Sequence, residues 1–159
     1  MTDDRRDRYF APVPWLRTEP EGVADELQKI HVQLRAIGKQ LEDQADRAPY
    51  TFIAERLQEL GENEESNATR VAERLAELGR HADDAESGVV LEGRNCWERL
   101  VRLQDGYREL IRGLKLVAVR WDEEHPEDAQ LVASVLASAS AHRATVGDLV
   151  ARADPHALN

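Results

Sequence analysis

The sequence is poor in cysteine and aromatic residues and has no long hydrophobic run. Its single cysteine, Cys96, has no second cysteine for an internal disulfide, which points to a reducing compartment. No apolar stretch approaches the roughly 20 residues that a membrane-spanning helix needs, and the first ten residues lack the apolar segment of a signal peptide. We therefore expect a cytoplasmic protein that has no membrane partner.

The composition favours an acidic, helical domain. Hydrophobic residues make up 42% of the chain, aromatic residues 5% and charged residues 33%. This balance is typical of amphipathic helices that pack through Leu, Val and Ala, and not of a β-sandwich. The net charge of −10 repels DNA, and no lysine-rich tail compensates for it, so we expect no DNA binding and assign no nucleic-acid-binding residue.

The clearest helical pattern extends from Phe52 to Arg80. Apolar residues recur there at spacings of three and four, which places them on one stripe of a helix of about eight turns; they are Ile53, Leu57, Leu60, Val71, Leu75 and Leu78. Glu64 and Asn67 occupy two positions that the same period assigns to the core. Such a polar gap is either a tolerated defect or the wall of a site.

Three further segments show the same period, and together they predict an all-α protein. The first helix carries apolar residues from Val23 to Leu41 and ends before Pro49. The third begins at the cap signal 95–98, and the fourth begins at 125–128 with proline in its first turn. A long connection at 81–95 permits a crossover that makes the second and third helices parallel, as in ferritin-like four-helix bundles.

The chain is predicted to form one domain with two flanking segments. Residues 1–20 form an N-terminal arm, residues 21–153 the four-helix bundle, and residues 154–159 a C-terminal tail. Prolines keep the arm from being helical. Its aromatic residues, Tyr9, Phe10 and Trp15, are expected to dock on the protein itself or on a neighbouring subunit.

Several stretches within residues 24–152 resemble the Dps group of the ferritin-like superfamily. They are 52–54 (FIA), 72–79 (AERLAELG), 103–107 (LQDGY) and the helix that follows Glu127-Asp128. The resemblance implies a ferritin-like fold that assembles into a hollow homo-dodecamer, oxidises and stores iron, and acts in iron homeostasis and the stress response. Many members of the group bind DNA through basic tails.

The ferroxidase positions that the resemblance implies are degenerate here. Gln44-Ala45 stands where the family has a His-Trp pair, and residues 54–60 have no counterpart of its second His and nearby Asp. Of the family's later Asp and Glu, Thr69 replaces the first and only Glu73 remains. Two ferrous ions need more carboxylates and imidazoles than this. We therefore predict a weakened or lost ferroxidase and assign no catalytic residue, with iron as the one expected cofactor and Glu73 as a candidate ligand.

A polar layer is predicted at the centre of the bundle. If the four helices are centred together, five residues lie within about two turns of one layer: His31, Glu64, Asn67, Tyr107 and His142. Two imidazoles and a carboxylate suit a metal ion, which makes His31, Glu64 and His142 candidate ligands beside Glu73. The Glu-x-x-His motif of the superfamily is absent, and such a layer can equally hydrogen-bond to itself.

Two functional hypotheses follow. The first is a Dps-like, homo-oligomeric protein of iron or stress homeostasis. The second is an all-helical interaction or scaffold protein without metal chemistry. Gly106 and Gly113, seven residues apart on one face of the third helix, predict a close helix approach within the subunit or between subunits.

Overall fold

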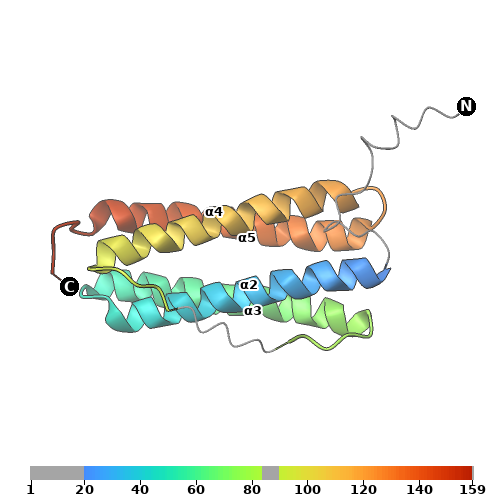
Figure 1. Cartoon of the computed structure of the whole chain (residues 1–159), viewed down its shortest axis with the longest axis horizontal. Helices are drawn as coiled ribbons and strands as arrows, with labels where there is room; N and C mark the ends of the chain where they lie inside the picture. Colours follow the sequence, from blue (N-terminus) through green and yellow to red (C-terminus); the bar gives the residue numbers. More distant parts are fainter. Residues whose placement is uncertain (1–19, 84–89, 159) are drawn as a thin grey trace, which may run out of the picture.

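The computed structural model describes residues 20–83 and 90–158, which contain four long helices and no strand. The helices are α2 (Pro20–Arg47), α3 (Thr51–Glu77), α4 (Cys96–Trp121) and α5 (Pro126–Arg152) (Figure 1). None of them is long and apolar enough to cross a membrane. The predicted N-terminal arm lies outside the described residues, apart from Pro20, the first residue of α2.

The helices form two antiparallel hairpins that pack side by side. Short turns join α2 to α3 and α4 to α5, whereas the connection after α3 returns to the opposite end of the bundle before α4 begins (Figure 1). As a result α3 and α4 run in the same direction. This confirms the predicted crossover and the four-helix bundle.

Local signals set most helix ends where the sequence places them. The Asn95 side chain accepts a hydrogen bond from the Glu98 backbone N–H at 2.9 Å, which caps α4. Pro126 begins α5, with Glu127 and Asp128 in its first turn. The predicted end of the second helix at Arg80 is wrong. The helix ends at Glu77, because Gly79 adopts a left-handed φ of 77° that terminates it.

The core is built largely from leucine and valine. The predicted stripe of α3 is buried from Ile53 to Leu75, and only Leu78, beyond the last turn, is partly exposed. Each leucine removed from water contributes roughly 2–3 kcal/mol to stability. The polar residues of the predicted layer are buried with these side chains, so the core has a polar centre.

Candidate functional site

Three side chains from three helices meet at the centre of the bundle. Glu64 on α3 is fully buried, and its Oε1 accepts a hydrogen bond from the Tyr107 hydroxyl of α4 at 3.2 Å. The Nδ1 atom of His142, on α5, is hydrogen-bonded to the same oxygen. We call Glu64, Tyr107 and His142 the core triad.

The apolar period of each helix carries these residues into the core. Glu64 lies four residues after Leu60 and seven before Val71, so the rotation that buries these two side chains buries the glutamate as well. Tyr107 and His142 occupy equivalent positions in the stripes of α4 and α5. Three independent stripes thus bring a carboxylate, a phenol and an imidazole to one layer.

The electrostatics of the core triad keep Tyr107 neutral. Burial raises the pKa of the Tyr107 hydroxyl far above its usual range, and the negative charge and hydrogen bond of Glu64 raise it further. A protonated phenol can donate to the carboxylate. The second carboxylate oxygen, Glu64 Oε2, is buried and has no hydrogen-bond partner among the residues that the structure describes. A buried carboxylate oxygen in this state is costly and attracts a cation.

The other two residues of the predicted layer are buried but lie apart from the core triad's shared oxygen. Asn67 donates from Nδ2 to the Ser138 hydroxyl on α5 at 3.0 Å, which makes it a contact between hairpins. His31 is buried on α2 and lines a groove on the outside of the α2–α3 hairpin. The structure therefore joins three of the five residues directly.

The four predicted metal ligands fall into two places. Glu64 and His142 touch in the core, whereas His31 and Glu73 line the outer groove, where Glu73 is exposed. Among the residues that the structure describes, no three His, Cys, Asp or Glu side chains are grouped so that they could hold a metal ion. The described protein groups supply at most two such ligands at the core triad.

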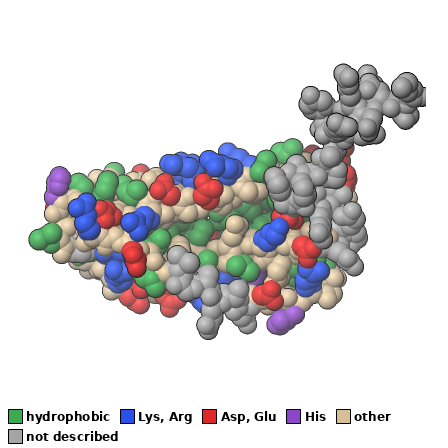
Figure 2. Space-filling view, viewed as in Figure 1, with side chains coloured by type: hydrophobic (Ala, Val, Ile, Leu, Met, Phe, Trp, Pro, Cys, Tyr) green, Lys and Arg blue, Asp and Glu red, His purple; other side chains and the backbone are tan. Residues whose placement is uncertain are grey.

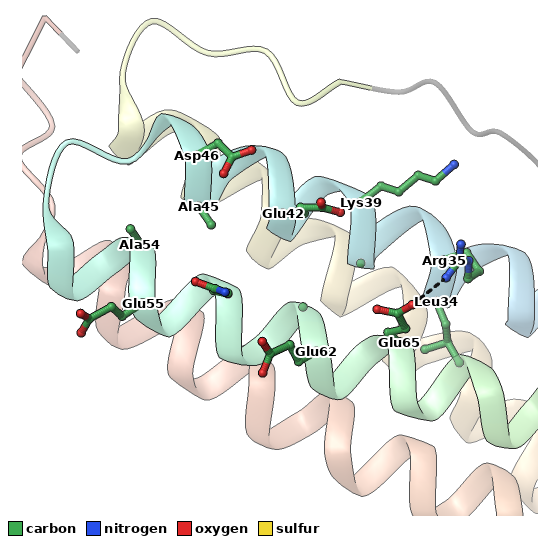
Figure 3. Close-up of a pocket in the computed structure, with 13 residues that line it drawn as sticks. Leu34, Arg35, Lys39, Glu42, Ala45, Asp46, Ala54, Glu55, Glu62 and Glu65 are labelled. Atoms are coloured by element: carbon green, nitrogen blue, oxygen red, sulfur yellow. Dashed lines mark ion pairs between the residues drawn. The ribbon is translucent and has the colours of Figure 1, made fainter.

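A second groove on the α2–α3 hairpin is lined in part by Ala45 and by residues of the 54–60 stretch, which were compared above with ligand-bearing stretches of the Dps group. It measures about 460 Å³ and is lined by both charged and small residues (Figure 3). The helices approach closely at its floor, where a Cβ atom on Gly61 would lie 3.6 Å from Leu41 Cβ. Ala45, the second residue of the pair compared with the family's His-Trp, and Ala54, the first residue of the 54–60 stretch, both line the groove.

The charged residues of this groove are mainly acidic. Arg35 and Glu65 form an ion pair across it, with 3.6 Å between the Nη1 and Oε1 atoms (Figure 3). The remaining acidic residues that line it are Glu42, Asp46, Glu55 and Glu62. None of the described residues that line this groove is a histidine, so it has carboxylates without the imidazoles that the resemblance would imply.

Gln44, the other residue at the family's His-Trp position, has a structural role. Its side chain is buried, and its carbonyl accepts a hydrogen bond from Arg99 Nε of α4 at 2.7 Å. Burial lowers the pKa of the Arg99 guanidinium, and the nearby positive charge of Arg47 lowers it further. Gln44 and Arg99 thus tie the two hairpins together at one end of the bundle.

Sequence reasoning missed a partly buried ion pair at the opposite end of the bundle. Arg74 of α3 donates from Nε to Asp128 Oδ1 at 2.6 Å and from Nη2 to Asp128 Oδ2 at 3.3 Å. Hydrogen bonds to Asp128 and Glu77 raise the pKa of Arg74. Asp128 was interpreted only as a first-turn acid of α5. The available signal was its position four residues before Val132, which the helical period assigns to the buried side.

Comparisons with known proteins bear on the fold. No protein-family model matches the chain, and no curated protein matches it. Among solved structures, a mutant of Dps1 from Mycobacterium smegmatis aligns with a TM-score of 0.74 over 82% of this chain and 96% of that chain. The chain has a ferritin-like fold. At 17% sequence identity, the likeness extends to the arrangement of helices and not to individual site residues.

Proposed function

We propose that this protein serves iron or stress homeostasis in the cytoplasm as a Dps-like homo-oligomer that binds iron but oxidises it slowly or not at all. The fold supports the first part, since it resembles that of Dps1. The observation that carries the proposal is Glu64 Oε2, a buried carboxylate oxygen with no hydrogen-bond partner in the described part of the chain, on a residue that also contacts His142. Ferrous iron would enter as cargo.

The ligand chemistry of the core triad supports binding better than oxidation. Glu64 would supply Oε2 as a ligand. His142 would supply an unprotonated ring nitrogen. Tyr107 keeps its proton and donates a hydrogen bond to Oε1, the oxygen that His142 also contacts, which helps to orient the carboxylate. Paired oxidation of ferrous iron requires a second ion nearby, and the described residues offer no second set of ligands.

Anaerobic titration of the protein with ferrous iron tests the binding. We expect about one equivalent per chain, and a loss of affinity of about tenfold or more in Glu64→Gln. The matched control is Glu65→Gln, an exposed neighbour on the same helix, which should bind as the unaltered protein does. Equal binding by both variants would place the iron elsewhere.

Aerobic loading with ferrous iron tests the oxidation. Absorbance of ferric iron should rise little faster than in a buffer blank, while metal analysis after desalting should find retained iron. If no iron is retained above the blank, the iron function fails. Rapid oxidation beyond the blank would instead contradict the predicted loss of ferroxidase activity.

The alternative is a helical scaffold without metal chemistry, and one observation favours it. Glu64 Oε1 already bonds both Tyr107 and His142, so half of the carboxylate is satisfied by the protein itself. In that case ferrous iron would leave the thermal unfolding midpoint unchanged. A rise in the midpoint with iron concentration would favour the iron function, since a ligand stabilises the state that binds it.

A further inference from the structure

One side of α4 is an exposed helix face with charges of both signs. Residues recur along it at spacings of three and four, and all are exposed. We call this surface the α4 outer face: Arg102, Asp105, Glu109, Arg112, Leu116, Val119 and Arg120. Positively charged, negatively charged and hydrophobic side chains also mix along the upper edge of the molecule in Figure 2, where α4 and α5 lie.

The centre of this face is open and partly apolar. Leu116 and Val119 are 54% and 81% exposed, unusual for large aliphatic side chains next to one another on a helix. A Cβ atom on the neighbouring Gly113 would have no atom within 4 Å, and the same holds for Gly106. Each glycine destabilises a helix interior by about 0.5–1 kcal/mol, yet no residue that the structure describes packs closely against either one.

Three groups of charge follow one another along the face. Arg102 lies near the start of α4, and Asp105 and Glu109 follow it in the first half. Arg112 and Arg120 lie in the second half. Among the described residues, Glu109 forms an ion pair with Arg112, with 3.4 Å between the charged atoms and both side chains about two-thirds exposed. Such an exposed pair contributes little to stability and leaves both charges accessible to a partner.

This arrangement is complementary to itself when two copies of α4 lie antiparallel. With a two-fold axis between Arg112 and Gly113, Asp105 of one copy lies opposite Arg120 of the other, each about 11 Å along the helix from the axis. Glu109 then lies within reach of the second copy's Arg112. A parallel arrangement would instead place each charged residue next to the same residue of the second copy, so that like charges would meet.

We propose that the α4 outer face binds the same face of a second copy of this chain, with the two helices antiparallel about that two-fold axis. Gly113 lets the backbones approach closely at the axis, and Leu116 and Val119 lose contact with water there. One helix per copy is a small interface held by exposed charges. The contact is therefore weak and sensitive to salt. It does not depend on iron binding.

A charge exchange tests the pairing. Asp105→Arg places like charges opposite Arg120 and should weaken association about tenfold at low salt, because each two-fold contact loses two ion pairs. The double variant D105R/R120D restores opposite signs and should return the dissociation constant to within about threefold of the original. Sedimentation at several protein concentrations measures both. Arg56→Glu is the control, because Arg56 is exposed on α3. It should leave the dissociation constant unchanged.

Cross-linking tests the position of the axis. Arg112→Cys puts a thiol next to the axis, where it meets the second copy's thiol and should give a disulfide-linked dimer under mild oxidation. Arg108→Cys is the matched control: it is exposed on the same helix, but the two thiols would be offset by about 13 Å along the axis. Equal cross-linking of both variants, or no rescue by the charge exchange, would overturn the proposal.

Iron titration of D105R should match the unaltered protein, which separates this contact from the iron function.

Discussion

At the scale of single residues, the core triad shows how burial assigns different roles to neighbouring polar groups. The Tyr107 hydroxyl is fully buried and donates to a carboxylate, which keeps it protonated. Glu64 accepts a hydrogen bond from that phenol at Oε1, and its Oε2 has no partner among the described side chains and backbone groups. The first group is satisfied and structural, whereas the second has capacity left for a ligand.

The protonation of Tyr107 should be visible in alkaline titrations. Its pKa in the folded protein is raised above the unfolded value of roughly 10. The stability that the protonated Tyr107 hydroxyl contributes is therefore fully present below the unfolded pKa. It is lost as the pH rises through the higher pKa of the folded protein. We expect Tyr107→Phe to give the same tyrosinate absorbance as the unaltered protein while both are folded. A difference between the two near pH 10 would contradict the burial of the phenol.

The Arg74–Asp128 pair should carry a large part of the contact between α3 and α5. Asp128→Ala leaves the Arg74 guanidinium, about one-quarter exposed, without its bidentate partner. We expect a loss of about 2–4 kcal/mol in the free energy of unfolding, measured by urea denaturation. Glu127→Ala is the control, because Glu127 is mostly exposed and lies 3.6 Å from Arg74. It should cost at most about 0.5 kcal/mol. Equal losses of unfolding free energy in the two variants would mean that the bidentate geometry of the Arg74–Asp128 pair contributes little to stability.

How much of the site the sequence predicts depends on what periodicity can specify. It gives the buried side of each helix, which is why burial of His31, Glu64, Asn67, Tyr107 and His142 was predicted correctly. It does not give the axial offset or rotation between helices at the level of single atoms. The sequence therefore could not show that Tyr107 and His142 share one oxygen of Glu64 while His31 lies at a groove.

At the scale of elements, Asn95 joins the start of α4 to the C-terminal tail. Its carbonyl caps the helix, and its amide Nδ2 donates to the carbonyls of Pro155 and Ala157 at 2.9 and 3.0 Å. The cap of α4 thus depends on the oxygen of this amide, and the attachment of the tail depends on its nitrogen. This side chain links Pro155 and Ala157 of the tail to the start of α4, whereas Leu158 is exposed.

Two substitutions of Asn95 should separate the cap from the tail. Asn95→Ser keeps a capping oxygen but cannot reach the tail carbonyls, and we expect a loss of about 1 kcal/mol. Asn95→Ala loses both functions and should cost about 2 kcal/mol. Thermal or urea unfolding gives these values. Digestion with a carboxypeptidase should be faster in both variants, and unchanged digestion would show that the tail is held by other contacts.

The fold was largely predictable at this scale because loop length constrains helix direction. Short turns at 48–50 and 122–125 require antiparallel neighbours, and the long link at 78–95 allows α4 to start at the other end of the bundle. The end of α3 was less predictable. Its apolar period continues through Leu78, and the left-handed backbone of Gly79 overrides it.

At the scale of the whole molecule, the polar contacts between the hairpins align them along their length. Gln44 bonds Arg99 at one end, Glu64 bonds His142 at the centre, and Arg74 bonds Asp128 at the other end. Apolar stripes alone tolerate a shift by one helical turn, whereas three directional contacts spread along the bundle do not. This polar seam explains how a core made of similar aliphatic residues selects one register.

The overall charge leads to a last prediction, about DNA. The chain carries a net charge of −10, and the cations of the α4 outer face are interleaved with Asp105 and Glu109, so phosphates approaching α4 would meet both signs. We expect no shift of duplex DNA in a gel at low salt, where any electrostatic binding would be strongest. A shift that disappears on adding salt would contradict this expectation. If Arg112→Glu also abolished that shift, α4 would be the DNA-binding surface, and the antiparallel contact between copies would compete with it.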